Sequence, residues 1–181
     1  LGVVLERLPP TLLLTFLSIT ATLSFSVPLG AWLGRRPDST DRQLVGVLVY
    51  VSQGVPGFVA GLLLIQIFAV ELRWLPSFGH EGLSNWILPT LTLASFLAPK
   101  LTRVIAANVT EAMREDYIRT ARSFGVSSAA LLWRHALPNA LLGATALVGT
   151  QFAFLISGAV ITEVIFAWPG LGWLLVKATT T

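Results

Sequence analysis

The sequence has no cysteine and very little charge. The missing cysteine excludes a disulfide framework, a thiolate metal site and a cysteine nucleophile. Charged residues make up only 12% of the 181 residues and hydrophobic residues 54%, whereas soluble domains carry about 25% charge. A chain with so few charges cannot cover a soluble globule with an ordinary polar surface. The composition therefore indicates a membrane protein.

The charged residues are also bunched. Four stretches of 27, 28, 18 and 28 residues contain no Asp, Glu, Lys or Arg. A helix needs about 20 apolar residues to cross the hydrocarbon core of a bilayer. The sequence therefore predicts an all-α, polytopic transmembrane domain with a polar loop at about 105–134. The predicted spans are about 10–33, 44–69, 86–104 and 137–161.

The two ends of the sequence carry a further expectation. The chain begins at Leu1 with neither an initiator Met nor a signal-peptide pattern. It stops at Thr181, after an apolar piece that is too short to span a bilayer. We therefore expect a truncated part of a longer chain.

Basic residues predict the orientation, because short loops rich in Lys and Arg stay in the cytoplasm. The loop at 34–43 holds three of them and the polar stretch at 100–134 holds six, whereas the other parts together hold three. The long loop is therefore predicted to be cytoplasmic. We interpret the net charge of +3 as a consequence of the membrane orientation. No nucleic-acid partner is therefore expected.

Neutral polar residues interrupt the predicted spans. Thr11, Thr15, Ser18 and Thr22 recur at a spacing that places them on one helical face. Packing against another helix is favoured over lining a path, because small side chains allow helices to approach closely. Proline in the second span predicts a kink. The candidate translocation-path residues are Gln53, Pro56, Asn139 and Gln151, with interhelical hydrogen bonding as the alternative for the amides.

Ionisable groups are missing from the predicted span interiors, which argues against coupling to protons or sodium. Glu163, at the end of the fourth span, is predicted to be a solvated interface residue. The two histidines, His80 and His135, are predicted on opposite sides of the membrane, so no metal or acid–base site is expected between them. No G-x-x-x-x-G-K-[ST] loop is present, so the chain is not expected to be an ATPase or another enzyme.

The long loop contains one predicted amphipathic helix. Asp116 is a suitable N-cap, and Gly125 suits the left-handed position after a helix end. Tyr117, Ala121 and Phe124 are spaced to form one apolar strip. Such a helix can dock into a groove on a cytoplasmic partner or lie on the membrane surface, and the residues alone leave both open.

The same loop resembles the EAA motif of ABC importer permeases, E-A-A-x3-G-x9-I-x-L-P. Ala121, Gly125 and the pair Leu137-Pro138 match it by spacing, whereas Arg119, Thr120 and His135 depart from it. These departures are similar to the dipeptide/oligopeptide/nickel branch. That branch is also similar to the stretches at 73–76, 114–125, 134–140 and 166–172, the first of which resembles its B-type subunit.

The resemblance implies a subunit that forms the translocation path and moves when ATP is bound and released elsewhere. It implies two cytoplasmic ATPase subunits that hold ATP and Mg²⁺, a second permease subunit, an extracytoplasmic solute-binding protein and a multi-pass location in a bacterial or archaeal plasma membrane. The loop helix would be the coupling helix. The expected ATPase-coupling residues are Asp116, Tyr117, Arg119, Thr120, Ala121, Arg122, Phe124, Gly125, Leu137 and Pro138.

Three functions follow in order of preference. The first is a permease subunit for peptides or similar small solutes. The second is a permease for another solute of the same branch, such as nickel, glutathione or an oligosaccharide. The third, from a different class, is an ion-coupled secondary transporter or a membrane scaffold without a transport role.

Overall fold

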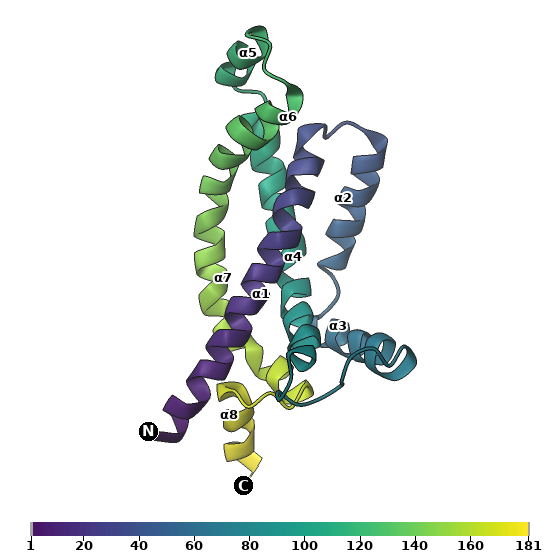
Figure 1. Cartoon of the computed structure of the whole chain (residues 1–181), viewed down its shortest axis with the longest axis vertical. Coiled ribbons are helices and arrows are strands. Elements are labelled where there is room, and N and C mark those ends of the chain that lie inside the picture. Colours follow the sequence, from purple (N-terminus) through teal and green to yellow (C-terminus); the bar gives the residue numbers. More distant parts are fainter. Residues whose placement is uncertain (1, 181) are drawn as a thin grey trace. The chain divides into compact units, whose positions relative to one another are not determined.

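The computed structural model describes residues 2–180, and over this range it contains helices and no strand (Figure 1). The predicted all-α class is confirmed. The helices, in which η marks a π-helical segment, are α1 (Gly2–Arg35), α2 (Thr40–Ser52), α3 (Gly57–Leu64), η1 (Ile65–Glu71), α4 (Leu83–Ala112), α5 (Asp116–Ser123), α6 (Ser128–Ala130), η2 (Leu131–Ala136), α7 (Leu137–Ile165) and α8 (Leu171–Thr180).

Two helical segments within the described residues are long and apolar enough to cross a membrane, Val4–Arg35 and Ser128–Ile156. A third is added if Thr40–Ser52 and Gly57–Glu71 count as one interrupted span. The interruption falls at the predicted kink, where Pro56 precedes the first residue of α3. Proline lacks the N–H that a continuing helix would need, so the chain stops and restarts there.

The helix α4 contains the third predicted span and extends beyond it. We predicted a loop from about residue 105, but α4 continues to Ala112. Ile105 and Val109 are fully buried, and this apolar face extends the helix past Lys100 and Arg103. Both basic residues therefore lie inside a helix. The long loop is correspondingly shorter than predicted, and α5 is its main element.

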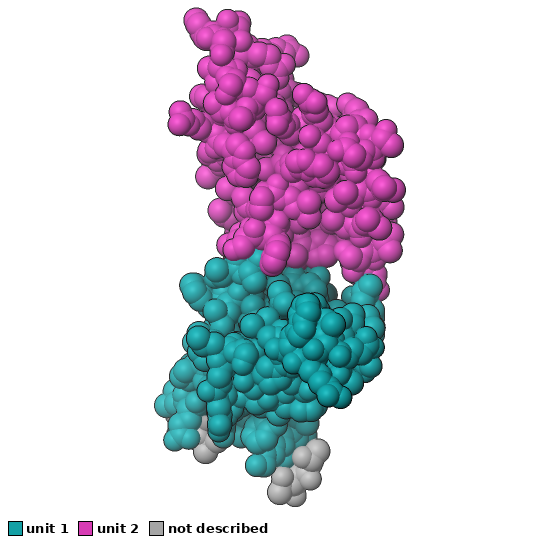
Figure 2. Space-filling model, turned by 45° about the vertical axis from the view of Figure 1, so that its right-hand side comes forward, with its two compact units in different colours: residues 1–22, 55–97, 150–181 teal, residues 23–54, 98–149 magenta. Residues whose placement is uncertain are grey.

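The chain divides into two compact units, coloured separately in Figure 2. The second unit comprises residues 23–54 and 98–149, and its core joins α1, α4, η2 and α7. Gly34 allows close packing there, since a Cβ at that position would overlap the Ala106 carbonyl oxygen. The buried apolar residues of this core are Ala31, Leu101, Ile105, Val109, Leu132, Leu137, Ala140 and Ala144.

Polar side chains in the second unit bond to backbone carbonyls of neighbouring helices. The Ser26 hydroxyl donates to the Ala98 carbonyl over 3.0 Å, and the Thr110 hydroxyl donates to the Gly34 carbonyl over 3.1 Å. Such bonds satisfy hydroxyls that would otherwise be costly in an apolar environment. The two bonds join α1 to α4.

The first unit comprises residues 2–22, 55–97 and 150–180 of the described range. Its core contains Leu14, Leu93, Leu97, Leu155, Ala159 and Trp168. The predicted hydroxyl stripe of α1 is buried here, each member being at most 1% exposed. Gly61 of α3 packs so closely that a Cβ would lie 2.9 Å from Thr92, which accounts for a small residue at that position.

Glu163 was predicted to be solvated, and that prediction is wrong. The side chain is fully buried. Its carboxylate accepts hydrogen bonds from the Thr11 hydroxyl at 2.6 Å and from the backbone N–H groups of Gly172 at 2.7 Å and Trp173 at 3.2 Å. Leu171 N–H donates to the Thr11 oxygen over 2.9 Å. Thr11 and Glu163 together satisfy the first N–H groups of α8, where the helix dipole also favours a negative charge.

The turn between α7 and α8 brings those partners together. Ala167 adopts a left-handed conformation with φ of 51°, and the Trp168 N–H returns to the Glu163 carbonyl over 2.8 Å. The Trp168 indole is buried and donates to the Pro10 carbonyl over 3.0 Å. The sequence pattern gave no sign that this turn would fold back onto Glu163.

We predict that Glu163→Ala destabilises the protein. Three donors lose a charged acceptor in a buried site, and each such bond contributes about 1.5–3 kcal/mol. Thermal unfolding of the full-length protein in detergent should show a clearly lower midpoint. Glu81→Ala is the matched control, since Glu81 is exposed. Equal midpoints for the two variants would contradict the buried network.

Candidate coupling site

The N-terminus of α5 differs by one residue from the prediction. Glu115 occupies the N-cap position with an extended backbone, and Asp116 is the first helical residue. Asp116 still carries its charge in the first turn, where the dipole favours it. Its carboxylate pairs with Arg119 at 3.3 Å, but both side chains are at least 75% exposed. Such a pair contributes little to stability.

The C-terminus of α5 closes in a Schellman turn, as the predicted role of Gly125 requires. Gly125 has φ of 81°. Its N–H donates to the Arg122 carbonyl over 3.0 Å, and the Val126 N–H donates to the Ala121 carbonyl over 3.2 Å. These two bonds define the Schellman motif. Val126 and Ala121 also pack against the same apolar cluster, which is centred on Ile118.

The buried side of α5 rests on a residue that the sequence analysis did not single out. Ile118 is fully buried against Ala112, Leu131 and Ala136. It lies one residue, or about 100° around the helix, from the predicted strip. The sequence did contain a signal for this buried face. Ile118 and Ala121 are three residues apart, a spacing that also places two side chains on one side of a helix.

The predicted apolar strip is divided in the structure. Ala121 is partly buried against the Ile118 cluster. Tyr117 is 39% exposed and Phe124 is 82% exposed. Phe124 therefore presents a large apolar side chain on the outer surface of α5, next to the end of the helix.

A second contact holds α5 to the beginning of α7. The Asn139 side-chain amide donates to the Tyr117 hydroxyl over 3.0 Å. Both residues line a cleft of about 320 Å³ together with Glu111 and Glu115. Asn139 was predicted to line the translocation path, whereas here it contacts the predicted coupling helix.

The remaining coupling residues also have defined positions. Thr120 and Arg122 are exposed on α5, and the Thr120 hydroxyl donates to the Asp116 carbonyl over 3.0 Å. Leu137 is buried in the core of the second unit, whereas Pro138 is exposed. The motif's Leu therefore anchors the beginning of α7.

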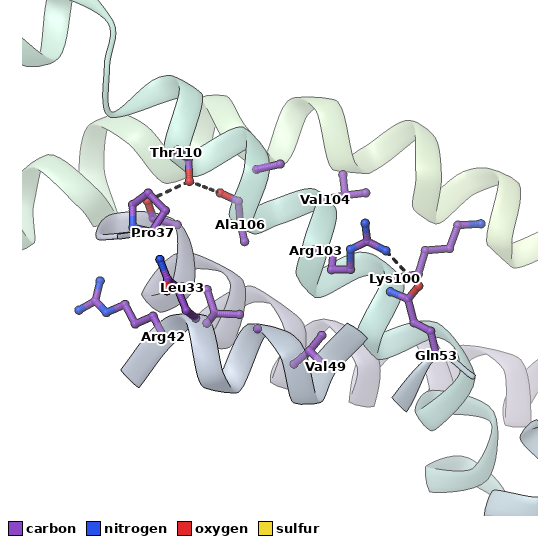
Figure 3. Close-up of a pocket in the computed structure, with 14 residues that line it drawn as sticks. Leu33, Pro37, Arg42, Val49, Gln53, Lys100, Arg103, Val104, Ala106 and Thr110 are labelled. Carbon is purple, nitrogen blue, oxygen red and sulfur yellow. Dashed lines mark hydrogen bonds between the residues drawn. The ribbon is translucent and has the colours of Figure 1, made fainter. Parts of the chain in front are cut away.

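The four predicted path residues are divided between the two units. In the second unit, the Gln53 side-chain oxygen accepts from Arg103 over 3.2 Å (Figure 3), and Asn139 lies at the Tyr117 cleft. In the first unit, Pro56 is exposed before α3 and Gln151 is largely buried in α7. Their role in transport stays a prediction.

These features define a helical membrane domain that presents a short, anchored helix at its surface. The sequence model of the binding-protein-dependent transport system inner membrane component matches residues 26–181. The chain belongs to this family, and the family resemblance drawn from the loop is confirmed.

Individual relatives agree with the family. The chain is 38% identical over 177 residues to the glutathione transport system permease protein GsiC of Escherichia coli K12, covering 96% of this chain and 56% of the relative. The same values hold for GsiC of Shigella flexneri serotype 5b. The chain thus spans about half the length of these curated relatives.

A solved structure supports the fold. The crystal structure of an amino acid ABC transporter with histidines superimposes with a TM-score of 0.71 at 21% sequence identity, covering 99% of this chain and 79% of that one. At this identity the likeness concerns the arrangement of helices alone.

We predict that Gly125→Val strains the turn after α5 and lowers transport by the assembled system. A β-branched residue at this φ of 81° is strained by roughly 1–2 kcal/mol. Gly125→Asn is the matched control, because Asn tolerates the left-handed region. Uptake should fall clearly for Val and little for Asn at equal membrane levels. Full uptake by the Val variant would contradict the role of this turn.

Proposed function

We propose that this chain belongs to a permease subunit of an ATP-driven, binding-protein-dependent importer of peptides or similar small solutes. The subunit forms the translocation path and has no ATPase site of its own. Two cytoplasmic ATPase subunits bind ATP and Mg²⁺, a second permease subunit completes the membrane part, and an extracytoplasmic protein delivers the solute. Family membership supports this set of partners.

The observation that carries the proposal is the combination of an exposed and an anchored face on α5. Phe124 and Tyr117 offer apolar surface to a partner, while Ile118 fixes the helix to the protein. An amphipathic helix of this kind fits a hydrophobic groove. Movement of the groove would then be passed to α4 and η2, whose residues surround Ile118.

The same family and the distribution of charge support the proposed location. The subunit lies in a bacterial or archaeal plasma membrane with several passes, and α5 faces the cytoplasm. Three basic residues at 34–43 and four at 113–134, beyond the end of α4, support this orientation. A groove on a soluble ATPase can reach α5 only from that side.

Glutathione is the favoured alternative solute. The relatives that match 96% of this chain are glutathione transport permeases, and glutathione is itself a short peptide. An ion-coupled transporter is disfavoured by the family rather than by empty helix interiors, since Lys100 and Arg103 lie within α4.

We predict that Ala121→Cys in the full-length subunit crosslinks to a cysteine in the groove of the ATPase. The chain has no cysteine of its own, so one thiol reports one position. Phe124→Cys should crosslink more readily, because Phe124 is 82% exposed. Ser84→Cys, exposed at the beginning of α4, is the negative control. Failure of both α5 positions in every nucleotide state would overturn the assignment.

We also predict that Tyr117→Phe weakens the connection between α5 and α7. It removes one hydrogen bond, a loss of about 0.5–1.5 kcal/mol, while keeping the ring. Solute uptake per ATP hydrolysed should fall, and Asn139→Ala should have the same effect. Because the two residues share the bond, the double variant should be no worse than either single one. Additive losses would show that the bond plays no part.

A further inference from the structure

The first unit contains an aromatic pocket that the proposed coupling does not use. It has a volume of about 210 Å³ and lies between the beginning of α3, the middle of α4 and the C-terminal part of α7. All of its described lining residues belong to this unit. The Phe96 and Phe154 rings stack with their centres 5.6 Å apart, and Phe58 supplies a third ring. The pocket therefore offers aromatic surface to a small apolar group.

The three rings are left partly uncovered by the chain. Phe58 is 47% exposed, Phe96 45% and Phe154 53%. Exposed apolar clusters of this kind mark binding surfaces for a ligand, a protein or a membrane. Lipid, another subunit and a solute are therefore the candidates to cover the rings, and two polar features of the same pocket distinguish between them.

The first polar feature is the Thr162 hydroxyl. Thr162 lines the pocket and is only 5% exposed. Thr92 lines the pocket as well, and its hydroxyl donates to the Leu88 carbonyl over 2.8 Å. The Thr162 side chain has no such bond to any residue that the structure describes. A buried hydroxyl without a partner is costly, and the chain of a lipid has no group that could pair with it.

The second polar feature is the beginning of α3, which follows the interruption at Pro56. Pro56 provides no side-chain cap, and the N–H groups of residues 57–59 bond to nothing within the described range, whereas that of Ala60 reaches the Pro56 carbonyl over 3.1 Å. The segments before and after the interruption together meet the length and composition of a membrane span. Unpaired backbone groups in such a span face water or protein and not lipid.

We propose that this pocket binds an apolar side chain of the transported solute, and that the solute is a peptide with a large apolar residue. A peptide carries carbonyl or carboxylate oxygens beside its side chain, so one ligand supplies both the apolar group and the missing acceptors. A helix of a second subunit could cover the rings, but its backbone groups are already paired within the helix.

This inference rests on the proposed function and narrows its substrate class. It favours peptides with a side chain such as that of leucine or phenylalanine over glutathione, which has none of that size. Family membership does not make this distinction, because the glutathione permeases and this chain share the same membrane domain.

The test places one thiol in the pocket of the full-length subunit, with the complete transporter in nanodiscs, which leave both membrane faces open to solutes. Ile161 lines the pocket and is 57% exposed. Ile161→Cys should react with a water-soluble methanethiosulfonate that carries a trimethylammonium group, as measured on this subunit by mass spectrometry. Ser84→Cys, at the exposed beginning of α4 and outside the pocket, is the control.

Two tripeptides serve as the protecting ligands. Glycyl-leucyl-glycine should slow the labelling of Ile161→Cys, with half-protection at a concentration about 10-fold lower than for triglycine. This ratio is the one expected for burial of a single leucine side chain. Neither peptide should slow the labelling of Ser84→Cys.

Substitutions assign the protection to the pocket. Phe96→Ala should raise the half-protecting concentration of glycyl-leucyl-glycine about 10-fold by removing apolar contact. Thr162→Val, which removes the hydroxyl and keeps the shape, should raise it about fivefold. Phe16→Ala makes the same change as Phe96→Ala at an exposed ring on α1, outside the pocket, and should leave it unchanged.

The labelling is measured without nucleotide and with ATP, and the proposal requires protection in at least one of these states. An Ile161→Cys thiol that never reacts would show that lipid or another subunit fills the pocket, which overturns the proposal. Equal protection by the two peptides, protection by neither, or unchanged protection in Phe96→Ala would overturn it as well. No reading depends on import, so a transporter that takes up solute with ATP and fails this test contradicts the pocket assignment alone.

Discussion

The attachment of α5 to the rest of the chain is the constraint on which the account depends. A helix of eight residues is not stable by itself in water. Ile118 packs it against α4 and η2, the turn at Gly125 closes its end, and Tyr117 connects it to α7. Force applied to α5 therefore acts on helices of the membrane domain. A helix attached by its flanking loops alone would move without consequence.

Helices α5 and α7 are both followed by a turn that supplies donors to their last carbonyl groups. The last carbonyls of a helix need donors, and a chain that folds back at the helix end can supply them. Both helices end in a left-handed residue, Gly125 in one and Ala167 in the other. Alanine is strained there by roughly 1–2 kcal/mol. Burial of Phe166 and Trp168 and the carboxylate network of Glu163 offset that strain.

The sequence predicted the features that depend on local pattern. Uncharged stretches gave the helical membrane class, Gly125 the left-handed turn, and Pro56 the interruption before α3. Features that depend on contacts between distant residues were missed. Nothing in the local sequence distinguishes Ile118 from other apolar residues, because its burial depends on Ala112 and Leu131. The burial of Glu163 likewise depends on Thr11, which lies 152 residues away in the sequence. Lys100 and Arg103 were counted with the polar stretch at 100–134, whereas buried Ile105 and Val109 continue α4 past both residues to Ala112.

The central claim is that this subunit is driven by a separate ATPase, and uptake into proteoliposomes tests it most directly. The full-length subunit would be reconstituted with its partner permease, ATPases and binding protein, and uptake of the binding protein's radiolabelled ligand measured with ATP. The account predicts that uptake stops when the catalytic glutamate of the ATPase is replaced by glutamine. Uptake that continues with this inactive ATPase, driven by a proton or sodium gradient, would contradict it.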